Sequence, residues 1–463
     1  MESSNGLKSG QWTSVFGQVV PEADVSTRQQ LKGNPNNTSK LINELCDTLI
    51  WTDAKKPQIV ANTANAAAFM RLHPQWQNVL AFDTFRYTGV LSKPIPGSNC
   101  GDAFCAMRPV KDTDYVAAQQ WLQANGMPRI AKQAVIDAMD LVAAENRVDP
   151  LFNEVERCQS KWDGEHRLEK LFTDYFEAEI NNAYTRELGK IAMMTLVLRA
   201  IHPGGFQKMV PILEGPQSIG KSRGVAALCF SSEWFGDSLP PIHNKDVSGY
   251  LRGKFIIEIA ELSATKRADI DELKSFVSRS VEKYRPPYGR KEVEEPRRCM
   301  LWGTTNREDY LRDETGNCRF FPVRLKSVNV ERLERDRDQL IGEAATLLKE
   351  AMSARENWWQ FSNEAEELLV VERDSRGEDH PWTSQVLAFV SELTEVAIPN
   401  ILYSGDEKTP KGLGIPKACG SRRDSNAVAG ILKANGWTRE GKFTSGKWKG
   451  QARYRIKELA VEN

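Results

Sequence analysis

The feature that most constrains the fold is a glycine-rich loop set between an apolar run and a helical pattern. The apolar run is Met209–Leu213, the loop Glu214–Ser222 reads EGPQSIGKS, and the helical pattern covers Arg223–Phe230. The loop has the spacing G-x-x-x-x-G-K-S, in which backbone N–H groups surround phosphates and the glycines allow close approach. A strand before the loop and a helix after it are the context that this motif requires. The sequence therefore predicts a nucleotide-binding α/β core.

Within this loop, two side chains carry the expected phosphate and metal chemistry. Lys221 supplies positive charge to the β- and γ-phosphates, and the Ser222 hydroxyl is the expected Mg²⁺ ligand. We therefore predict ATP and Mg²⁺ as cofactors. The predicted nucleotide-binding residues are Gly215, Pro216, Gln217, Ser218, Ile219, Gly220, Lys221 and Ser222.

Two acidic residues follow the next predicted parallel strand. Phe255–Ile259 is apolar enough for a strand that is buried on both faces, and Glu258 and Glu261 stand at its C-terminal end. One of them would hold Mg²⁺, with Glu258 as the metal candidate, and the other would polarise the attacking water. The alternative is that one of the two glutamates is only a surface or capping residue. The sequence does not identify which of them would then be the functional one.

Two further catalytic candidates follow along the chain. Asn306 ends the apolar strand Met300–Thr305, where an amide can hold the attacking water against the γ-phosphate. Arg319 stands just before an aromatic strand and could reach the nucleotide of a neighbouring subunit as an arginine finger. The alternative for Arg319 is a structural ion pair.

A basic and aromatic loop lies between the acidic strand and the asparagine strand. Asp271–Val281 is predicted to be a helix, and Lys283–Lys291 reads as a loop or hairpin in which Tyr284 is one of the aromatic residues. Cations for phosphates and rings for bases are typical of single-strand contacts. The alternative is a solvated hairpin with structural aromatics. The predicted DNA-binding residues are Arg285, Tyr288, Arg290 and Lys291.

The length of 463 residues and the uneven distribution of charge along the chain indicate several domains. The whole chain has 62 Lys and Arg against 62 Asp and Glu, which excludes a uniformly basic nucleic-acid coat protein. We predict a flexible tail (1–33), an N-terminal α+β domain (34–155), the ATPase core (156–360), a linker (361–379) and a winged-helix-like domain (380–463). In the N-terminal domain, Asp112 and Asp114 either begin a helix or form a metal-binding pair, and the helix start is favoured. Residues 79–90 alternate as a strand or hairpin does, and an amphipathic helix is predicted after Gly164 at the start of the core.

The C-terminal region carries a local excess of positive charge. Residues 406–463 hold 13 Lys and Arg and 6 Asp and Glu, so the excess is 13 − 6 = 7. Three helical patterns followed by a basic two-strand pattern at 438–456 give the order of a winged helix, in which one helix enters the major groove. The alternative is a protein-docking domain of the same fold. The predicted duplex contacts are Arg422, Arg423, Lys442, Lys447, Lys449 and Arg453.

Taken in order, these motifs resemble the virulence-associated protein E family of phages and mobile elements. The matching stretches are KWDGEHRLEKL, IHPGG, LEGPQSIGKS, GKFIIEIAEL, DELKSFVSRSVEKYRPPYGR, PRRCMLWGTTN and YLRDETGNCRFFPV. The resemblance implies an AAA+ P-loop ATPase core related to superfamily 3 helicases, assembled as a homo-oligomer, expected to be a hexameric ring. The family usually has two arginines before the aromatic strand, and this chain has Cys318 and Arg319. No primase motif is visible ahead of the core, so a separate primase is a possible partner.

Two functions from different classes are consistent with these features. The first is an ATP-dependent DNA helicase or replication initiator of a phage or mobile element, with single-stranded DNA in its pore and duplex DNA at its C-terminal domain. The second is a nucleotide-gated regulatory or defence ATPase that assembles without unwinding DNA. No apolar run is long enough for a membrane span, and eight scattered cysteines without a C-x-x-C pair favour reduced thiols. We therefore expect a bacterial or phage-infected host cytoplasm and no membrane partner.

Overall fold

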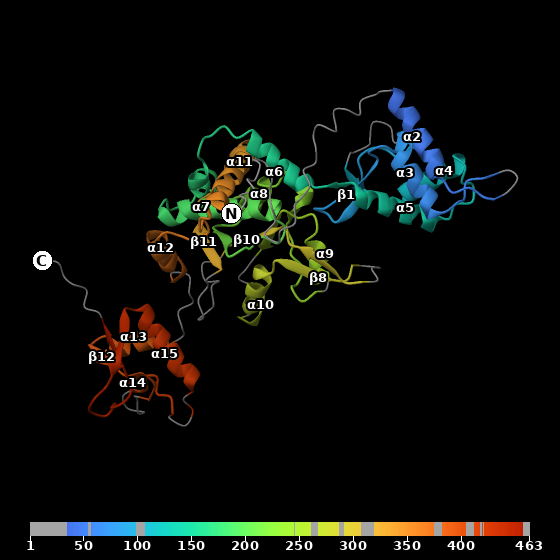
Figure 1. Cartoon of the computed structure of the whole chain (residues 1–463). Helices are drawn as coiled ribbons and strands as arrows, with labels where there is room; N and C mark the ends of the chain where they lie inside the picture. The colour runs from blue at the N-terminus through green and yellow to red at the C-terminus, as the bar shows by residue number, and fades with distance from the viewer. Residues whose placement is uncertain are drawn as a thin grey trace, which may run out of the picture.

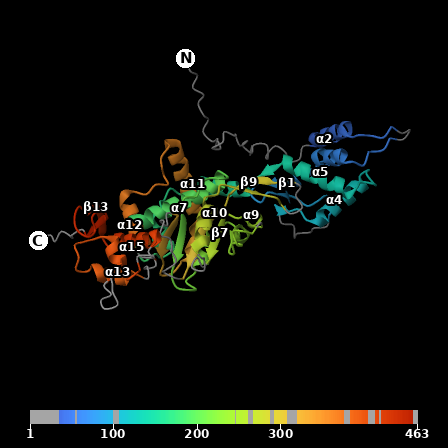
Figure 2. The same cartoon turned by 90° about the horizontal axis from the view of Figure 1, so that it is seen from below.

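The computed structural model describes most of the chain after the first 34 residues, and Figure 1 shows its arrangement. The N-terminal and C-terminal units lie at opposite ends of a central α/β unit in this view and after a 90° turn (Figure 2). The predicted tail, 1–33, lies outside the described residues. These are residues 35–53, 57–98, 107–244, 246–260, 267–286, 291–306, 319–374, 382–403, 412–416, 419 and 421–456.

The N-terminal unit is an α+β arrangement around its own apolar core. Its sheet has the order β3-β2-β1-β4, and β1 and β2 form the hairpin predicted around residues 79–90. Helix α4 begins at Asp112, and Asp114 accepts hydrogen bonds from the Lys111 backbone and from Arg108, so the acidic pair begins a helix as favoured. The elements are α2 (Pro35–Thr48), α3 (Thr63–Leu72), η1 (Pro74–Trp76), β1 (Leu80–Asp83), β2 (Thr88–Leu91), β3 (Arg108–Pro109), α4 (Asp112–Ala124), α5 (Lys132–Glu145) and β4 (Arg147–Val148).

A five-stranded parallel sheet forms the centre of the molecule. Its order is β11-β5-β10-β7-β6, so the strand that precedes the glycine loop, β5, lies between β10 and β11. All carboxyl ends therefore meet at one edge of the sheet, which is where ligands bind in open α/β sheets. The strands are β5 (Val210–Glu214), β6 (Phe235–Gly236), β7 (Ile256–Ala260), β10 (Met300–Thr305) and β11 (Phe320–Arg324).

Alternate side chains of the central strands enter two different apolar cores, one on each face of the sheet. Trp302 joins the core under α7 and α11, whereas Leu301 joins the core under α9 and α10. Burial on both faces explains why these strands are almost continuously apolar. The helices are α6 (Pro150–Ser160), η3 (Leu168–Lys170), η4 (Leu171–Tyr175), α7 (Ala183–Ile201), α8 (Lys221–Ala227), η5 (Ser232–Trp234), α9 (Val247–Tyr250), α10 (Arg267–Ser278), α11 (Val330–Ala354) and α12 (Asn363–Asp374).

Two segments of the central unit differ from the sequence prediction. The predicted linker, 361–379, contains α12, whose Ala365 and Leu369 are buried in the main core. The amphipathic helix expected after Gly164 is instead a short 3-10 turn followed by one π turn. Glu343 of α11 explains part of this difference, because its carboxylate accepts hydrogen bonds from the backbone N–H groups of Arg167 and Leu168.

The C-terminal unit has three helices and a small antiparallel sheet, in the predicted order. A strand that sequence analysis missed, β12, pairs with β14, so the sheet has three strands in the order β12-β14-β13. Its core includes Val386, Ile401 and Trp437. The elements are α13 (Thr383–Val390), β12 (Glu395–Val396), α14 (Ile398–Tyr403), α15 (Arg422–Ala434), β13 (Trp437–Lys442) and β14 (Ala452–Ile456). Across the described residues, none of the helices is both long and apolar enough to span a membrane.

Candidate nucleotide site and nucleic-acid surfaces

The glycine loop bends sharply between β5 and α8 because its backbone adopts left-handed conformations. Gly215, Ser218 and Gly220 have φ values of 150°, 69° and 96°. A Cβ on Gly215 would lie 2.8 Å from the carbonyl oxygen of Leu325, so only glycine fits there without movement of the backbone. The predicted residues Gly215 to Ser222 therefore form one compact turn at the carboxyl edge of the sheet.

Lys221 is the first residue of α8, and its ammonium group lies inside this turn. Its Nζ donates to the carbonyl oxygens of Gly215 and Pro216, both at 2.7 Å, and to Oδ1 of Asn306 at 2.8 Å. The residue is 7% exposed, and burial lowers its pKa while the nearby Glu258 carboxylate opposes that shift. The structure thus brings together Lys221 and Asn306, which sequence analysis had proposed from two separate strands.

Next to the lysine, two hydroxyl groups share one oxygen of a buried carboxylate. Ser222 donates to Oε1 of Glu258 at 2.6 Å, and Thr304 donates to the same oxygen. Glu258 is 2% exposed, and it pairs in register with Trp302 of β10. Sequence analysis missed Thr304, although a polar pair at the end of an apolar strand was a usable signal. Glu261, the other acidic candidate, lies outside the described residues.

Arg319 lies at the opposite edge of the sheet from this cluster. Its carbonyl accepts a hydrogen bond from Val210, the first residue of β5, whereas the glycine loop follows the last residue of that strand. A rise of about 3.3 Å per residue separates the two edges by roughly 15 Å. Its Nε donates to Oγ of Ser278 at 2.8 Å. Any contact of Arg319 with a nucleotide would therefore have to be with one bound by another subunit.

The predicted basic loop is a β-hairpin formed by β8 (Val281–Tyr284) and β9 (Val293–Pro296). Arg285 and Lys291 are exposed near its tip, whereas Tyr288 and Arg290 lie outside the described residues. Tyr284 is used within the hairpin, because its hydroxyl donates to Glu295 at 2.9 Å and Arg252 lies over its ring. The hydroxyl of Tyr284 is therefore engaged and a cation lies against its ring, and base stacking by this residue stays a prediction.

One buried ion pair and several hydrogen bonds connect the base of this hairpin to the elements around it. Arg297 is fully buried and donates to Glu282, with an Nε–Oε1 distance of 2.8 Å, and to the Phe276 carbonyl. Ser248 of α9 also donates to Glu282. The hydroxyl of Tyr87, from the N-terminal unit, donates to the carbonyl of Pro296 at 3.1 Å. The hairpin base is thus held by elements on both sides of it.

In the C-terminal unit, the basic residues are divided between solvent and the sheet. Lys442, Lys447 and Lys449 are exposed. The Arg453 side chain contacts the sheet, because its Nε donates a hydrogen bond to the backbone carbonyl of Glu440 in β13. Arg422 and Arg423 are the first residues of α15, and their side chains lie outside the described set.

The cluster at the carboxyl edge has the donor set that a nucleotide with Mg²⁺ requires. Lys221 is bonded to loop carbonyls and an amide, and within the described residues no carboxylate forms a salt bridge with it. A phosphate could replace those neutral acceptors and form a charge-assisted contact. The hydroxyl and carboxylate oxygens of Ser222 and Glu258 are the hard ligands that Mg²⁺ prefers.

Comparison with known proteins places the central unit in a defined family. Residues 155–378 match the family model of the virulence-associated protein E-like domain. A search of curated proteins found no match. Among solved structures, the apo C-terminal region of NrS-1 is similar with a TM-score of 0.39 and 12% identity, covering 81% of this chain and 95% of that chain. A second form of that region gives a TM-score of 0.39 and 13% identity, with coverages of 81% and 96%.

Proposed function

The central domain of this chain belongs to the virulence-associated protein E-like family, and we propose that it is an ATP-dependent, ring-forming DNA helicase or initiator for phage or mobile-element replication. The observation that carries this proposal is the cluster of Lys221, Ser222, Glu258 and Asn306 beside a strained glycine loop. A parallel sheet that carries this cluster at its carboxyl edge supports an AAA+ P-loop core.

In the proposed reaction, each residue acts on one part of the bound ATP. Lys221 leaves its loop carbonyls and neutralises charge on the β- and γ-phosphates. Ser222 and Glu258 would hold Mg²⁺, which supplies charge stabilisation at the phosphates when bound. Asn306 is freed when Lys221 turns to the phosphates, and its amide then orients the attacking water. Glu261 is proposed to polarise that water.

Ring assembly and DNA contacts complete the proposal. Arg319 lies on the edge opposite Lys221, which favours a role as an arginine finger toward a neighbouring subunit's ATP. Arg285, Tyr288, Arg290 and Lys291 of the hairpin would contact a single strand in the pore. The C-terminal unit would bind duplex DNA as a winged helix, through α15 and the lysines that follow it.

ATP hydrolysis with and without single-stranded DNA tests the chemical part of this proposal. We expect hydrolysis that DNA stimulates and that Lys221→Ala reduces by about 10³-fold or more, because transition-state charge loses several kcal/mol of stabilisation. Lys170→Ala is a matched control, because Lys170 is exposed and lies outside the loop. Turnover at the wild-type rate in Lys221→Ala would refute the assignment of the site.

A further inference from the structure

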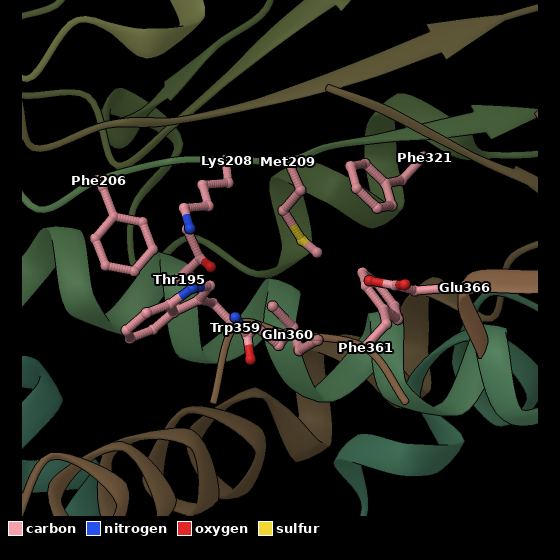
Figure 3. A pocket seen from close by; sticks show the side chains of 10 residues that line it. Thr195, Phe206, Lys208, Met209, Phe321, Trp359, Gln360, Phe361 and Glu366 are labelled. Carbon is pink, nitrogen blue, oxygen red and sulfur yellow. The ribbon is translucent and has the colours of Figure 1, made fainter. Parts of the chain in front are cut away.

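A second recess opens in the central unit, at the edge of the sheet opposite the glycine loop (Figure 3). Its volume is about 180 Å³, and Met209, which immediately precedes β5, forms part of its wall. It is lined by Ile191, Thr195, Phe206, Lys208, Met209, Phe321, Trp359, Gln360, Phe361 and Glu366.

Aromatic rings and one cation define the end of this recess where Phe206 lies. Phe206 is 37% exposed, and Trp358 stacks on it with centroids 5.8 Å apart and planes at 23°. Trp359 meets the same ring edge-on, at 5.1 Å. The Nζ of Lys208 lies 5.6 Å from the Phe206 centroid and 5.0 Å from that of Trp359. Within the described residues Lys208 forms no ion pair, so its charge is available to a ligand.

The polar groups at the other end are of the kind that pair with a base edge. Glu366 lies there beside Phe361, away from Phe206 and Lys208, whereas Gln360 lies beside Trp359 between the two ends (Figure 3). A carboxylate accepts hydrogen bonds from an exocyclic amine, and an amide both donates and accepts. An aromatic wall, a cation at one end, a carboxylate at the other and an amide between them match a nucleobase with its attached phosphate.

The loop that leads into the recess is connected to the base of the hairpin that is proposed to contact DNA. The loop that carries Phe206 and Lys208 begins at Pro203-Gly204, and the N–H of Gly204 donates to the carbonyl of Arg297 at the hairpin base. A Cβ on Gly204 would lie 3.3 Å from the Ser280 carbonyl and 3.5 Å from Pro296. The loop that carries Phe206 and Lys208 is therefore bonded to the base of the hairpin.

We propose that this recess holds one unpaired base of a single DNA strand, stacked against Phe206 and Trp359, with Lys208 on the neighbouring phosphate. This inference rests on the proposed function, because it adds a contact to the same DNA strand. It also assigns a role to the segment His202–Lys208, to which sequence analysis gave no chemistry.

Binding of a labelled oligodeoxycytidine to the full-length protein, followed by fluorescence anisotropy, tests this inference. Phe206→Ala should weaken binding about tenfold or more, since stacking on an aromatic side chain contributes that much per base. Lys208→Ala should lower the slope of affinity against salt by about one unit. Ile180→Ala and Lys170→Ala are matched controls, because both residues are exposed and lie outside the recess.

An abasic strand of the same length separates stacking from charge. On that strand we expect Phe206→Ala to bind as the wild type does, while Lys208→Ala still binds more weakly. The inference is overturned if Phe206→Ala leaves the affinity for oligodeoxycytidine unchanged while Arg285→Ala with Lys291→Ala lowers it; the recess would then serve a protein side chain. If the wild type binds neither strand, the proposed DNA function fails together with the inference.

Discussion

At the scale of single residues, one oxygen of Glu258 links the loop and the strands. Ser222 and Thr304 both donate to that oxygen, so the carboxylate is held by two elements before any ligand arrives. This arrangement favours a preorganised metal site, because a ligand fixed by its neighbours needs little rearrangement. Thr304→Val is therefore expected to raise the Mg²⁺ concentration that ATP hydrolysis requires, although it removes no metal ligand.

Glu258→Gln separates metal chemistry from nucleotide binding. The amide keeps a hydrogen-bond acceptor for Ser222 but loses the charge, so nucleotide affinity should change little while hydrolysis falls by about 10²-fold or more. Titration with a fluorescent ATP analogue and a steady-state phosphate assay measure the two quantities. Equal loss of binding and turnover would argue that Glu258 is structural.

The buried pair at the hairpin base predicts a large effect on stability. Arg297→Ala would leave Glu282 buried without its cation, which typically costs about 3–5 kcal/mol. The exposed pair Lys283–Glu294 in the same hairpin is a matched control, and Lys283→Ala should leave the melting temperature nearly unchanged. Thermal unfolding of the three proteins measures the difference, and similar melting temperatures would contradict the account of the hairpin base.

At the scale of elements, the sequence was informative wherever a local pattern decides the structure. The strands and helices around the glycine loop follow from alternating apolar residues and the loop glycines, and they were predicted. Helix α12 was missed because its exposed Val370 and Val371 obscure the apolar face that packs on α7. Strand β12 has two residues and depends on its pairing with β14, so no local pattern reveals it. The hydrogen bond from Tyr284 to Glu295 likewise depends on the pairing of two strands, so no local pattern reveals it.

The C-terminal unit predicts a division of labour in DNA binding. It has its own apolar core, so removal of residues 380–463 should leave the central unit folded. We expect the truncated chain to lose duplex affinity and its salt dependence, while ATP hydrolysis and single-strand affinity persist. Replacing Arg290 and Lys291 by alanine should do the reverse and uncouple hydrolysis from translocation. Unchanged duplex binding after truncation would assign this unit to protein docking.

At the scale of the whole molecule, the glycine loop and Arg319 lie on opposite edges of one sheet, which predicts complementation between subunits. Arg319→Ala should bind ATP but hydrolyse it about 10³–10⁵-fold more slowly. Added Lys221→Ala subunits should partly restore hydrolysis, because they present Arg319 to an intact loop. Wild-type subunits mixed in the same ratios calibrate the exchange. No restoration at any ratio, in assemblies of confirmed mass, would contradict a role across the subunit boundary.

Strand displacement on a forked duplex tests whether the protein is an ATP-dependent helicase. A forked duplex with a labelled strand is incubated with the full-length protein and Mg²⁺, with and without ATP, and with Lys221→Ala as the matched inactive protein. We predict that the labelled strand is released only by the wild type and only when ATP is present. Hydrolysis of ATP without strand release, on forks with either polarity of single-stranded tail, would contradict the helicase and favour the nucleotide-gated regulatory ATPase.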